Sequence, residues 1–299
     1  MMMKCYLLSI IVCTHNRSRL LNKCLESLLA QNVNSIEIVV IDNNSQDDTA
    51  QIVNKYTIEH QNIRYFCETE IGLSHARNRG IMESTSEWVL YIDDDGIAFP
   101  NFVQRALYLI DRGDYDCVGG VYNGYYEDKK PRWVNDEYGS SKIISDNLVP
   151  CKFDVPTGGV VLYRKQSINS VGKFRVDLGM IGNHNFIGEE TELQYRLEKK
   201  GFRIGSDPHL KIWHLINPQY LKLSYPIKKA FNGGKYWAKT IYPKRKWNLF
   251  AQLICSIIIG LIYTFPKSLI KLFFQKNYYL ENLLFDLIIP TIRIFGKLS

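Results

Sequence analysis

Apolar runs of strand length alternate with helical periodicities along the N-terminal third of the chain. Runs rich in Ile and Val predict strands at Leu7 to Cys13, Ile36 to Ile41, Ile63 to Cys67 and Trp88 to Ile92. Apolar residues at helical spacing predict helices between them, which start near Leu20, Asp47 and Leu73. Near-continuous apolar strands that alternate with helices are typical of parallel sheets. The sequence therefore predicts an α/β fold with a mostly parallel sheet flanked by helices on both faces.

The same signals continue up to about residue 220. In chain order they predict a helix at Phe102 to Arg112, strands at Val118 to Tyr122 and Val155 to Tyr163, a helix at Glu190 to Lys200, and short strands at Phe202 to Ile204 and Leu210 to Trp213. A polar, aromatic-rich stretch at residues 123–150 has the length of a lid or binding loop. We predict one globular domain over residues 1–220.

Residues 221–299 have a different composition. Residues 201–299 carry 15 Lys and Arg against 3 Asp and Glu, a net charge of +12, whereas residues 1–200 have a net charge of −5. Trp247 to Phe265 is a 19-residue stretch without a charge, close to the roughly 20 residues that cross a bilayer. Basic residues beside apolar runs favour an anionic membrane surface over nucleic acid. We predict a basic, apolar helical extension at residues 221–299.

Three interpretations of this extension stay open. It can lie on a membrane as interfacial helices, because the residues after the uncharged stretch are amphipathic. It can insert fully, or it can be a soluble helical cap or oligomer contact. We expect the cytoplasmic face of a membrane, with peripheral or inserted attachment through residues 244–299.

Composition narrows the class of protein further. With 46% hydrophobic and 22% charged residues, the chain forms a folded core, which excludes disorder. Its seven cysteines are an odd number without a CxxC pair, which speaks against a disulfide framework or a zinc module and fits a reducing cytoplasm. The apolar stretch from Tyr6 to Val12 is short and lacks a cleavage site, so we interpret it as the first strand and not as a signal peptide.

The first segment that could form a ligand-binding site is the turn after the first strand, Thr14 to Ser18. It contains no glycine, which excludes a dinucleotide fingerprint or a phosphate-binding P-loop at the expected place. Asp93, Asp94 and Asp95 follow a buried strand directly, where open parallel sheets form their ligand crevice. Asp93 and Asp95 point to the same side of an extended backbone and can grip Mg²⁺ or Mn²⁺ together. The alternative is an acidic surface turn.

Four further candidates each have a structural alternative. Asp42 ends a strand and can accept hydrogen bonds from a base or ribose. Arg77 would lie near a phosphate if its helix lines the crevice. Glu189 and Glu190 open a helix, where acids favour the dipole, but one of them is free to deprotonate a hydroxyl. His214 follows a strand and is either a core or edge histidine or a third metal or phosphate ligand.

The ordered set of motifs resembles glycosyltransferase family 2 across roughly residues 7–216. The motifs are Ile11 to Arg17, Ile41 to Thr49, Gly72 to Asn78, Asp93 to Asp95, Thr157 to Gly159 and Gly188 to Glu190. The resemblance implies a GT-A type fold, a nucleotide-sugar donor, a divalent cation at the DxD motif and inversion at the anomeric carbon. Residues 1–220 would then be the glycosyltransferase domain and residues 221–299 a membrane-associated extension.

The resemblance also implies residue roles. The donor-binding residues would be Thr14, Asn16, Arg17, Asp42, Asn44, Arg77, Asp93 and Asp94, and the metal ligands Asp93 and Asp95. His214 is added as a metal ligand because the carboxylate site already predicts a cation. The family places its catalytic base in a Glu-Asp pair, whereas this chain has Glu189-Glu190 there, and we favour Glu190 as the base. The motif Q-x-x-R-W of processive synthases is absent, which favours transfer of one sugar.

The predicted function is transfer of a sugar to a saccharide or lipid-linked saccharide acceptor in cell-surface polysaccharide assembly. A rival of another class is a catalytically inactive, membrane-attached saccharide-binding or scaffold protein of the same fold. Nucleotidyl transfer to a sugar phosphate is disfavoured, because those enzymes usually carry a glycine-rich basic loop after the first strand. The sequence leaves the sugar, the acceptor and the oligomeric state open.

Overall fold

The computed structural model describes residues 6–135, 137–156, 159–181, 184–186, 188–240 and 247–298. The chain divides into two compact units. Unit 1 contains the described residues up to Tyr125 together with Gly139–His184 and Gly188–Leu215, and unit 2 contains Tyr126–Tyr138, Asn185–Ile187 and Ile216–Ser299. The two units are described separately below. The domain boundary expected at residue 220 stays a prediction.

The first half of unit 1 builds the parallel part of a nine-stranded sheet. Its strands are β1 (Leu8–Thr14), β2 (Ile36–Asp42), β3 (Ile63–Cys67) and β4 (Trp88–Ile92). The spatial order is β3-β2-β1-β4, and neighbouring strands in this part are parallel. Every residue of β2 is buried, as expected for a strand that is covered on both faces.

The second half of unit 1 extends the sheet with strands of both directions. These are β5 (Gly96–Ala98), β6 (Cys117–Tyr125), β7 (Val149–Pro150), β8 (Val160–Arg164) and β11 (Ile204–Leu215). β8 is antiparallel to both β4 and β6, whereas β6 and β11 are parallel to each other. β5 and β7 are antiparallel to β11. The carboxyl ends of β1, β4, β6 and β11 therefore lie at the same edge of the sheet.

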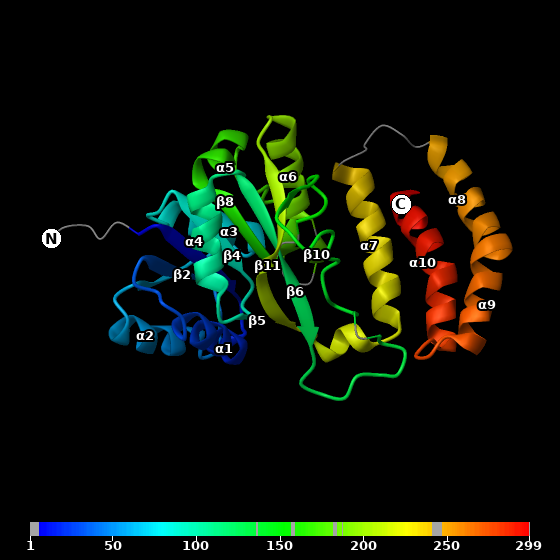
Figure 1. The fold of residues 1–299 in the computed structure, drawn as a ribbon, viewed down its shortest axis with the longest axis horizontal. Helices are drawn as coiled ribbons and strands as arrows, with labels where there is room; N and C mark the ends of the chain where they lie inside the picture. Colours follow the sequence, from blue (N-terminus) through cyan, green and yellow to red (C-terminus); the bar gives the residue numbers. More distant parts are fainter. Residues whose placement is uncertain are drawn as a thin grey trace. The chain divides into compact units, whose positions relative to one another are not determined.

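Helices cover both faces of this sheet (Figure 1). Ile10 of β1 packs into the cluster that includes α1 (Ser18–Leu29), α2 (Thr49–Glu59) and α4 (Phe102–Arg112). The next residue, Ile11, packs into the opposite cluster with α3 (Leu73–Glu83), α5 (Lys165–Val171) and α6 (Glu189–Lys199). Successive strand residues point to opposite faces, so one apolar run supplies two cores. The predicted α/β architecture with helices on both faces of the sheet is confirmed.

Two predictions about strands are wrong. The short strands expected at 202–204 and 210–213 are one twelve-residue strand, β11, whose pairing with β6 shifts between Ser206 and Lys211. Pro208 lies in the shifted segment, and proline donates no ladder hydrogen bond. The strand expected from Val155 begins only at Val160, and residues 153–156 and 159 form turns or bends. β9 (Gly179–Ile181) and β10 (His184–Phe186) form a separate two-stranded sheet.

Unit 2 is helical. After a short 3₁₀ turn at Pro218–Leu221 it contains α7 (Ser224–Thr240), α8 (Trp247–Ile259), a π-helical turn at Gly260–Thr264, α9 (Phe265–Phe274) and α10 (Leu280–Leu298). The predicted basic, apolar helical extension is therefore confirmed. α8, the π turn and α9 form one helical stretch, Asn248–Phe274, of 27 residues.

Within unit 2, α10 packs against α7 on one side and against α8 and α9 on another. Gly234 of α7 and Gly296 of α10 face each other's backbone so closely that a Cβ at either position would collide with it. Small residues at such crossings let helix backbones approach. On the other side, Asp286 accepts hydrogen bonds from Ser268 and Tyr278.

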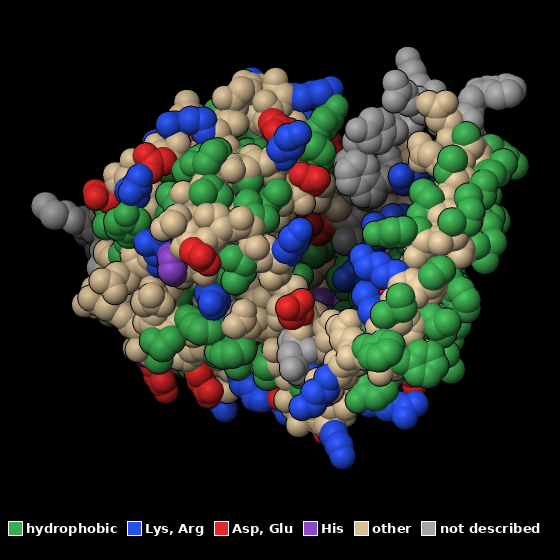
Figure 2. All heavy atoms as spheres, turned by 45° about the vertical axis from the view of Figure 1, so that its right-hand side comes forward, with side chains coloured by type: hydrophobic (Ala, Val, Ile, Leu, Met, Phe, Trp, Pro, Cys, Tyr) green, Lys and Arg blue, Asp and Glu red, His purple; other side chains and the backbone are tan. Residues whose placement is uncertain are grey.

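The stretch Asn248–Phe274 exposes its apolar side chains. Its mean hydropathy is 2.0 over its most apolar window, of which only 6% is buried. Figure 2 shows hydrophobic side chains gathered along this helical stretch on the right-hand side of the view. A helix of 27 residues is about 40 Å long, which is enough to cross a hydrocarbon core of about 30 Å. By length and composition, this helix of the described chain can span a membrane.

Candidate active site

The candidate site lies at the carboxyl-end edge of the unit 1 sheet. Asp93, Asp94 and Asp95 follow β4, and His214 lies near the end of β11. The backbone N–H of Leu215 donates to the carbonyl oxygen of Asp95 at 3.1 Å, which holds the two strand ends together. The edge of the sheet where the sequence predicts a crevice therefore carries side chains from segments about 120 residues apart.

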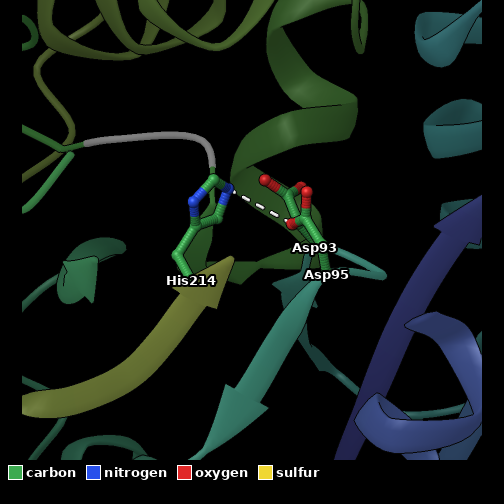
Figure 3. A group of neighbouring side chains, drawn as sticks. All are labelled: Asp93, Asp95 and His214. Carbon is green, nitrogen blue, oxygen red and sulfur yellow. Dashed lines mark ion pairs between the residues drawn. The ribbon is translucent and has the colours of Figure 1, made fainter. Parts of the chain in front are cut away.

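Asp93, Asp95 and His214 form a group that could hold a metal ion. One ligand atom from each lies within 4.8 Å of the others, and Figure 3 shows the three side chains converging. His214 Nε2 is 3.2 Å from Asp95 Oδ1. The ring of Tyr122, in β6, packs against the His214 ring with centroids 5.2 Å apart and restricts its orientation.

The donor set fits a divalent cation. Asp95 Oδ1 and His214 Nδ1 are buried but make no hydrogen bond of good geometry, which is uncommon for buried polar atoms. Burial raises the pKa of Asp95, but His214 and Arg17 outweigh it, so the carboxyl stays below its ordinary value. Burial lowers the pKa of His214, but the neighbouring Asp95 carboxylate raises it more. Carboxylate oxygens are typical ligands of Mg²⁺ and Mn²⁺, whereas an imidazole ligand is typical of transition metals.

Asp94 is not part of this group and binds Thr14 and Arg17. Its carboxylate accepts hydrogen bonds from Thr14 Oγ1 at 2.8 Å and from Arg17 at 2.9 Å, and its side chain is 6% exposed. Burial raises the pKa of Asp94 to about 6, although Arg17 opposes the shift. The contacts tie the end of β1 to the acidic triplet. The donor-binding roles of these three residues stay predictions.

Arg77 of α3 links the metal group to the start of α6. Its guanidinium is 3% exposed and lies 2.5 Å from Glu189 and 3.7 Å from Asp93, and it also forms an ion pair with Glu190. Phe174 stacks at 5.5 Å from the guanidinium carbon and helps to exclude water. Arg77 therefore neutralises acids from two distant segments. Its predicted contact with a donor phosphate stays a prediction.

One guanidinium carries a single positive charge and cannot neutralise three carboxylates, so the pKa values of two of these acids are raised. Burial and the charge of Glu190 raise the pKa of Glu189 to about 8, against the pull of Arg77. Burial raises the pKa of Asp93 to about 7, although Arg77 lowers it in part. Near neutral pH this cluster therefore retains a proton, and Glu189 carries it most readily.

Glu189 and Glu190 differ in exposure although they are adjacent. Glu189 is the first residue of α6 and its side chain is 4% exposed, whereas the side chain of Glu190 is 14% exposed. Gly188 before them has a φ of 120°, a conformation that favours glycine and turns the chain into the helix. The side chain of Glu190 is thus more exposed than that of Glu189.

The turns after β1 and β2 hold the remaining predicted donor residues. Asp42 is 2% exposed, and its oxygens accept hydrogen bonds from Tyr65 Oη at 2.7 Å and from the Ser45 N–H at 2.8 Å. Asn16 and Asn44 have φ values of 52° and 60°, the left-handed conformation that asparagine tolerates in turns. The structure brings both turns together through the Gln46 N–H, which donates to Asn16 Oδ1.

The Thr157 to Gly159 motif is described only in part, because residues 157 and 158 lie outside the described residues. A Cβ at Gly159 would lie 3.3 Å from Asp93 Oδ2, so glycine leaves space for the carboxylate.

The sequence analysis did not identify Tyr122 as a residue of the candidate site. An aromatic residue near the carboxyl end of a predicted strand is the signal that could have pointed to it.

Comparison of the sequence with a family profile and with curated proteins finds glycosyltransferases in both cases. The sequence profile of the family described as "Glycosyl transferase family 2" matches residues 9–172. Glycosyltransferase GlyG of Streptococcus pneumoniae serotype 4 is 29% identical over 122 residues, which are 40% of either chain. A GalNAc(5)-diNAcBac-PP-undecaprenol beta-1,3-glucosyltransferase of Campylobacter jejuni is 37% identical over 90 residues, which are 29% of either chain. This chain thus covers less than half the length of these two relatives.

Among solved structures, the mannosyltransferase PcManGT from Pyrobaculum calidifontis, in complex with GDP-Man and Mn²⁺, has a TM-score of 0.66. The alignment covers 96% of this chain and 86% of PcManGT at 15% sequence identity. At that identity the similarity shows a shared fold. The profile match, in contrast, spans more than half of the chain and includes β1 to β8 and α5.

Proposed function

Because the chain belongs to glycosyl transferase family 2, we propose that it is an inverting glycosyltransferase that moves one sugar from a nucleotide-sugar donor to a saccharide or lipid-linked saccharide acceptor. Single-sugar transfer is proposed because the processive motif Q-x-x-R-W is absent. PcManGT, which shares the fold, binds GDP-Man and Mn²⁺, and this supports a nucleotide-sugar donor and a divalent cation here.

The observation that carries the proposal is the ion-paired bridge through Arg77. It joins Asp93, at the end of β4, to Glu189 and Glu190, at the start of α6, within unit 1. A transferase of this kind needs a cation site for the donor diphosphate and a base for the acceptor beside each other. Asp93 belongs to the candidate cation group and Glu190 is a candidate base, so the two requirements meet at one crevice.

We assign the base role to Glu190. Its carboxylate would take the proton of the acceptor hydroxyl as that oxygen attacks the anomeric carbon from the face opposite the diphosphate. Glu189 is more deeply buried and holds its proton near neutral pH, since its pKa is about 8. It would therefore act as a buried partner that keeps Arg77 and Glu190 in position.

Asp93, Asp95 and His214 would hold the cation, which supplies positive charge to the diphosphate leaving group when it is bound. Asp95 is the most suitable of the carboxylates, because its pKa is lowered and its Oδ1 lies 3.2 Å from the Nε2 of His214, the other side of the candidate cation group. Donor contacts are proposed for the residues at the neighbouring strand ends, which are Thr14, Asn16, Arg17, Asp42, Asn44, Arg77, Asp93 and Asp94.

We further propose that the protein acts at the cytoplasmic face of a membrane, in cell-surface polysaccharide assembly. The exposed apolar stretch Asn248–Phe274 and the net charge of +12 over residues 201–299 support attachment to an anionic membrane. The name of the Campylobacter relative describes an undecaprenol-linked acceptor, which supports a lipid-linked acceptor here. Attachment uses residues 244–299, either by insertion or along the surface.

The experiment that tests the proposal has two stages. Nucleotide sugars are first screened with Mn²⁺ for thermal stabilisation of the full chain in neutral detergent. A donor at a hundredfold its Kd stabilises by about 2.7 kcal/mol, which shifts the melting point measurably. The stabilising donor is then incubated with saccharide and lipid-linked acceptors, and the anomeric configuration of the product is determined by NMR. An inverted linkage is expected, and a retained one contradicts the inverting mechanism.

A further inference from the structure

An apolar groove lies between α7 and α10 of unit 2. Its volume is about 490 Å³, within the range of sites for small ligands. The lining residues are Ile227, Lys228, Phe231, Asn232, Ile292 and Phe295. Phe295 is 52% exposed, so the groove presents an aromatic surface to its surroundings. An exposed aromatic wall of this kind is commonly part of an interaction site.

The close crossing of α7 and α10 builds this groove. Gly234 and Gly296 let the two backbones touch, because a Cβ at either position would collide with the opposite helix. Larger side chains on one side of the crossing, Phe231 and Phe295, then form the walls. The groove is therefore part of the helix packing and not a gap left by poor packing.

Two lysines of α7 lie on the groove side. Lys228 lines the groove, and Lys235 lies two helical turns further along the same side of the helix. The ammonium of Lys235 lies 5.6 Å from the centroid of the Phe231 ring, which is one of the groove walls. Both side chains are exposed. One edge of an apolar groove thus carries two positive charges.

Neither charge has an acidic partner in the described part of the chain, where Lys228 and Lys235 form no ion pair with a carboxylate. The acids of α10 lie elsewhere, since Glu281 pairs with Arg132 and Asp286 with Lys271. The edge of the groove is therefore complementary to an anion, while its walls are complementary to hydrocarbon.

We propose that this groove binds a phosphate-bearing lipid, with the hydrocarbon chain along Phe231, Ile292 and Phe295 and the phosphate at Lys228 and Lys235. The occupant is a lipid because the groove belongs to the same helical unit as Asn248–Phe274, whose apolar side chains are exposed. A soluble anion would leave the aromatic walls in water, and an uncharged chain would leave the lysines without a counterion. This inference does not depend on the proposed transferase activity.

The test uses the full chain in neutral detergent and native mass spectrometry, with hexadecyl phosphate as the probe. Inorganic phosphate and hexadecanol are the control probes. The double variant Lys228→Gln/Lys235→Gln removes the charges, and Asn232→Trp fills the groove from an exposed position that lines it. The matched control, Lys222→Gln/Lys276→Gln, removes two exposed lysines of unit 2 that do not line the groove. Circular dichroism verifies the helix content of each variant.

We expect the wild-type chain to retain hexadecyl phosphate and neither control probe. Both groove variants should lower the bound fraction at least fivefold, while the control variant stays within twofold. Retention of inorganic phosphate or of hexadecanol at the level of hexadecyl phosphate would overturn the proposal. So would retention that neither groove variant lowers, or a dimer that Asn232→Trp dissociates in the absence of lipid.

Discussion

Replacing Arg77 with methionine should destabilise unit 1 in a pH-dependent way. The substitution keeps an unbranched side chain of similar length but removes the charge that three carboxylates share. Glu189 lies 2.5 Å and Asp93 3.7 Å from the guanidinium, which is only 3% exposed. Solvent cannot replace the lost partner at such a site. The remaining carboxylates would either stay charged without a partner or take up protons.

The expected loss of stability follows from the burial of Arg77. Removing one partner of a buried ion pair typically costs about 3–5 kcal/mol. For a unit of this size, 1 kcal/mol lowers the melting point by about 2–4 °C, so a decrease of about 6–20 °C is expected near pH 8.5. Near pH 5.5 the loss should be smaller, because Asp93 and Glu189, with pKa values of about 7 and about 8, are then protonated and need the cation less.

Thermal unfolding followed by circular dichroism at the two pH values measures this effect. Arg79→Met is the matched control in the same helix, since Arg79 is 35% exposed and pairs with Glu83 at i,i+4. A partly exposed pair of that kind contributes less than about 1 kcal/mol. An equal loss at both pH values, or a loss no greater than that of Arg79→Met, would refute the role assigned to Arg77.

Two further predictions concern the second carboxylate and the membrane. The pKa of Glu189 is raised from 4.5 to about 8, so the folded state binds the extra proton and stability falls as pH rises through this window. Glu189→Gln should therefore be more stable than wild type at pH 8.5 and nearly equal to it at pH 4.5 in urea unfolding, and equal curves at pH 8.5 would contradict the assignment. Ile258 and Ile262 are 48% and 74% exposed, and Ile258→Glu/Ile262→Glu should abolish flotation with anionic vesicles, because charges at these positions oppose contact with hydrocarbon. Unchanged flotation would exclude this helix as the attachment.

The parallel part of the sheet could be predicted because its information is local. An apolar run such as that of β2 reports that both faces of the strand are covered. Strand direction is not encoded in such a run. β8 has the same apolar character as β4, yet the two are antiparallel, because direction depends on the path of the connecting chain.

The full length of β11 could not be predicted from the sequence, because it depends on a tertiary contact. Asp207 and Pro208 interrupt the apolar pattern and led to two predicted strands where one exists. Asp207 is fully buried, and Arg105 of α4 donates to it at 2.7 Å and 3.1 Å. In a sequence, a charged residue within an apolar run indicates a turn unless its ion-pair partner is known. The partner of Asp207 lies 102 residues away in the sequence.

For the candidate site too, some features could be predicted from the sequence and others could not. The place of Asp93 and Asp95 follows from the strand that precedes them, so the sequence could indicate it. The link between Arg77 and Glu189 depends on how α3 and α6 pack on one face of the sheet, which no local pattern contains. For the same reason the exposure that separates Glu190 from Glu189 could be seen only in the folded structure.

The most direct test of the account measures donor affinity and transfer rate together in two variants. With Mn²⁺ present, Asp95→Ala should lose metal-dependent donor binding, whereas Glu190→Gln should bind donor with nearly wild-type affinity and transfer at least a hundredfold more slowly, the range of a lost general base. Isothermal titration gives the affinity, and single-turnover product formation gives the rate. Full transfer by Glu190→Gln, or undiminished metal-dependent binding by Asp95→Ala, would contradict the division of roles between the two acidic segments.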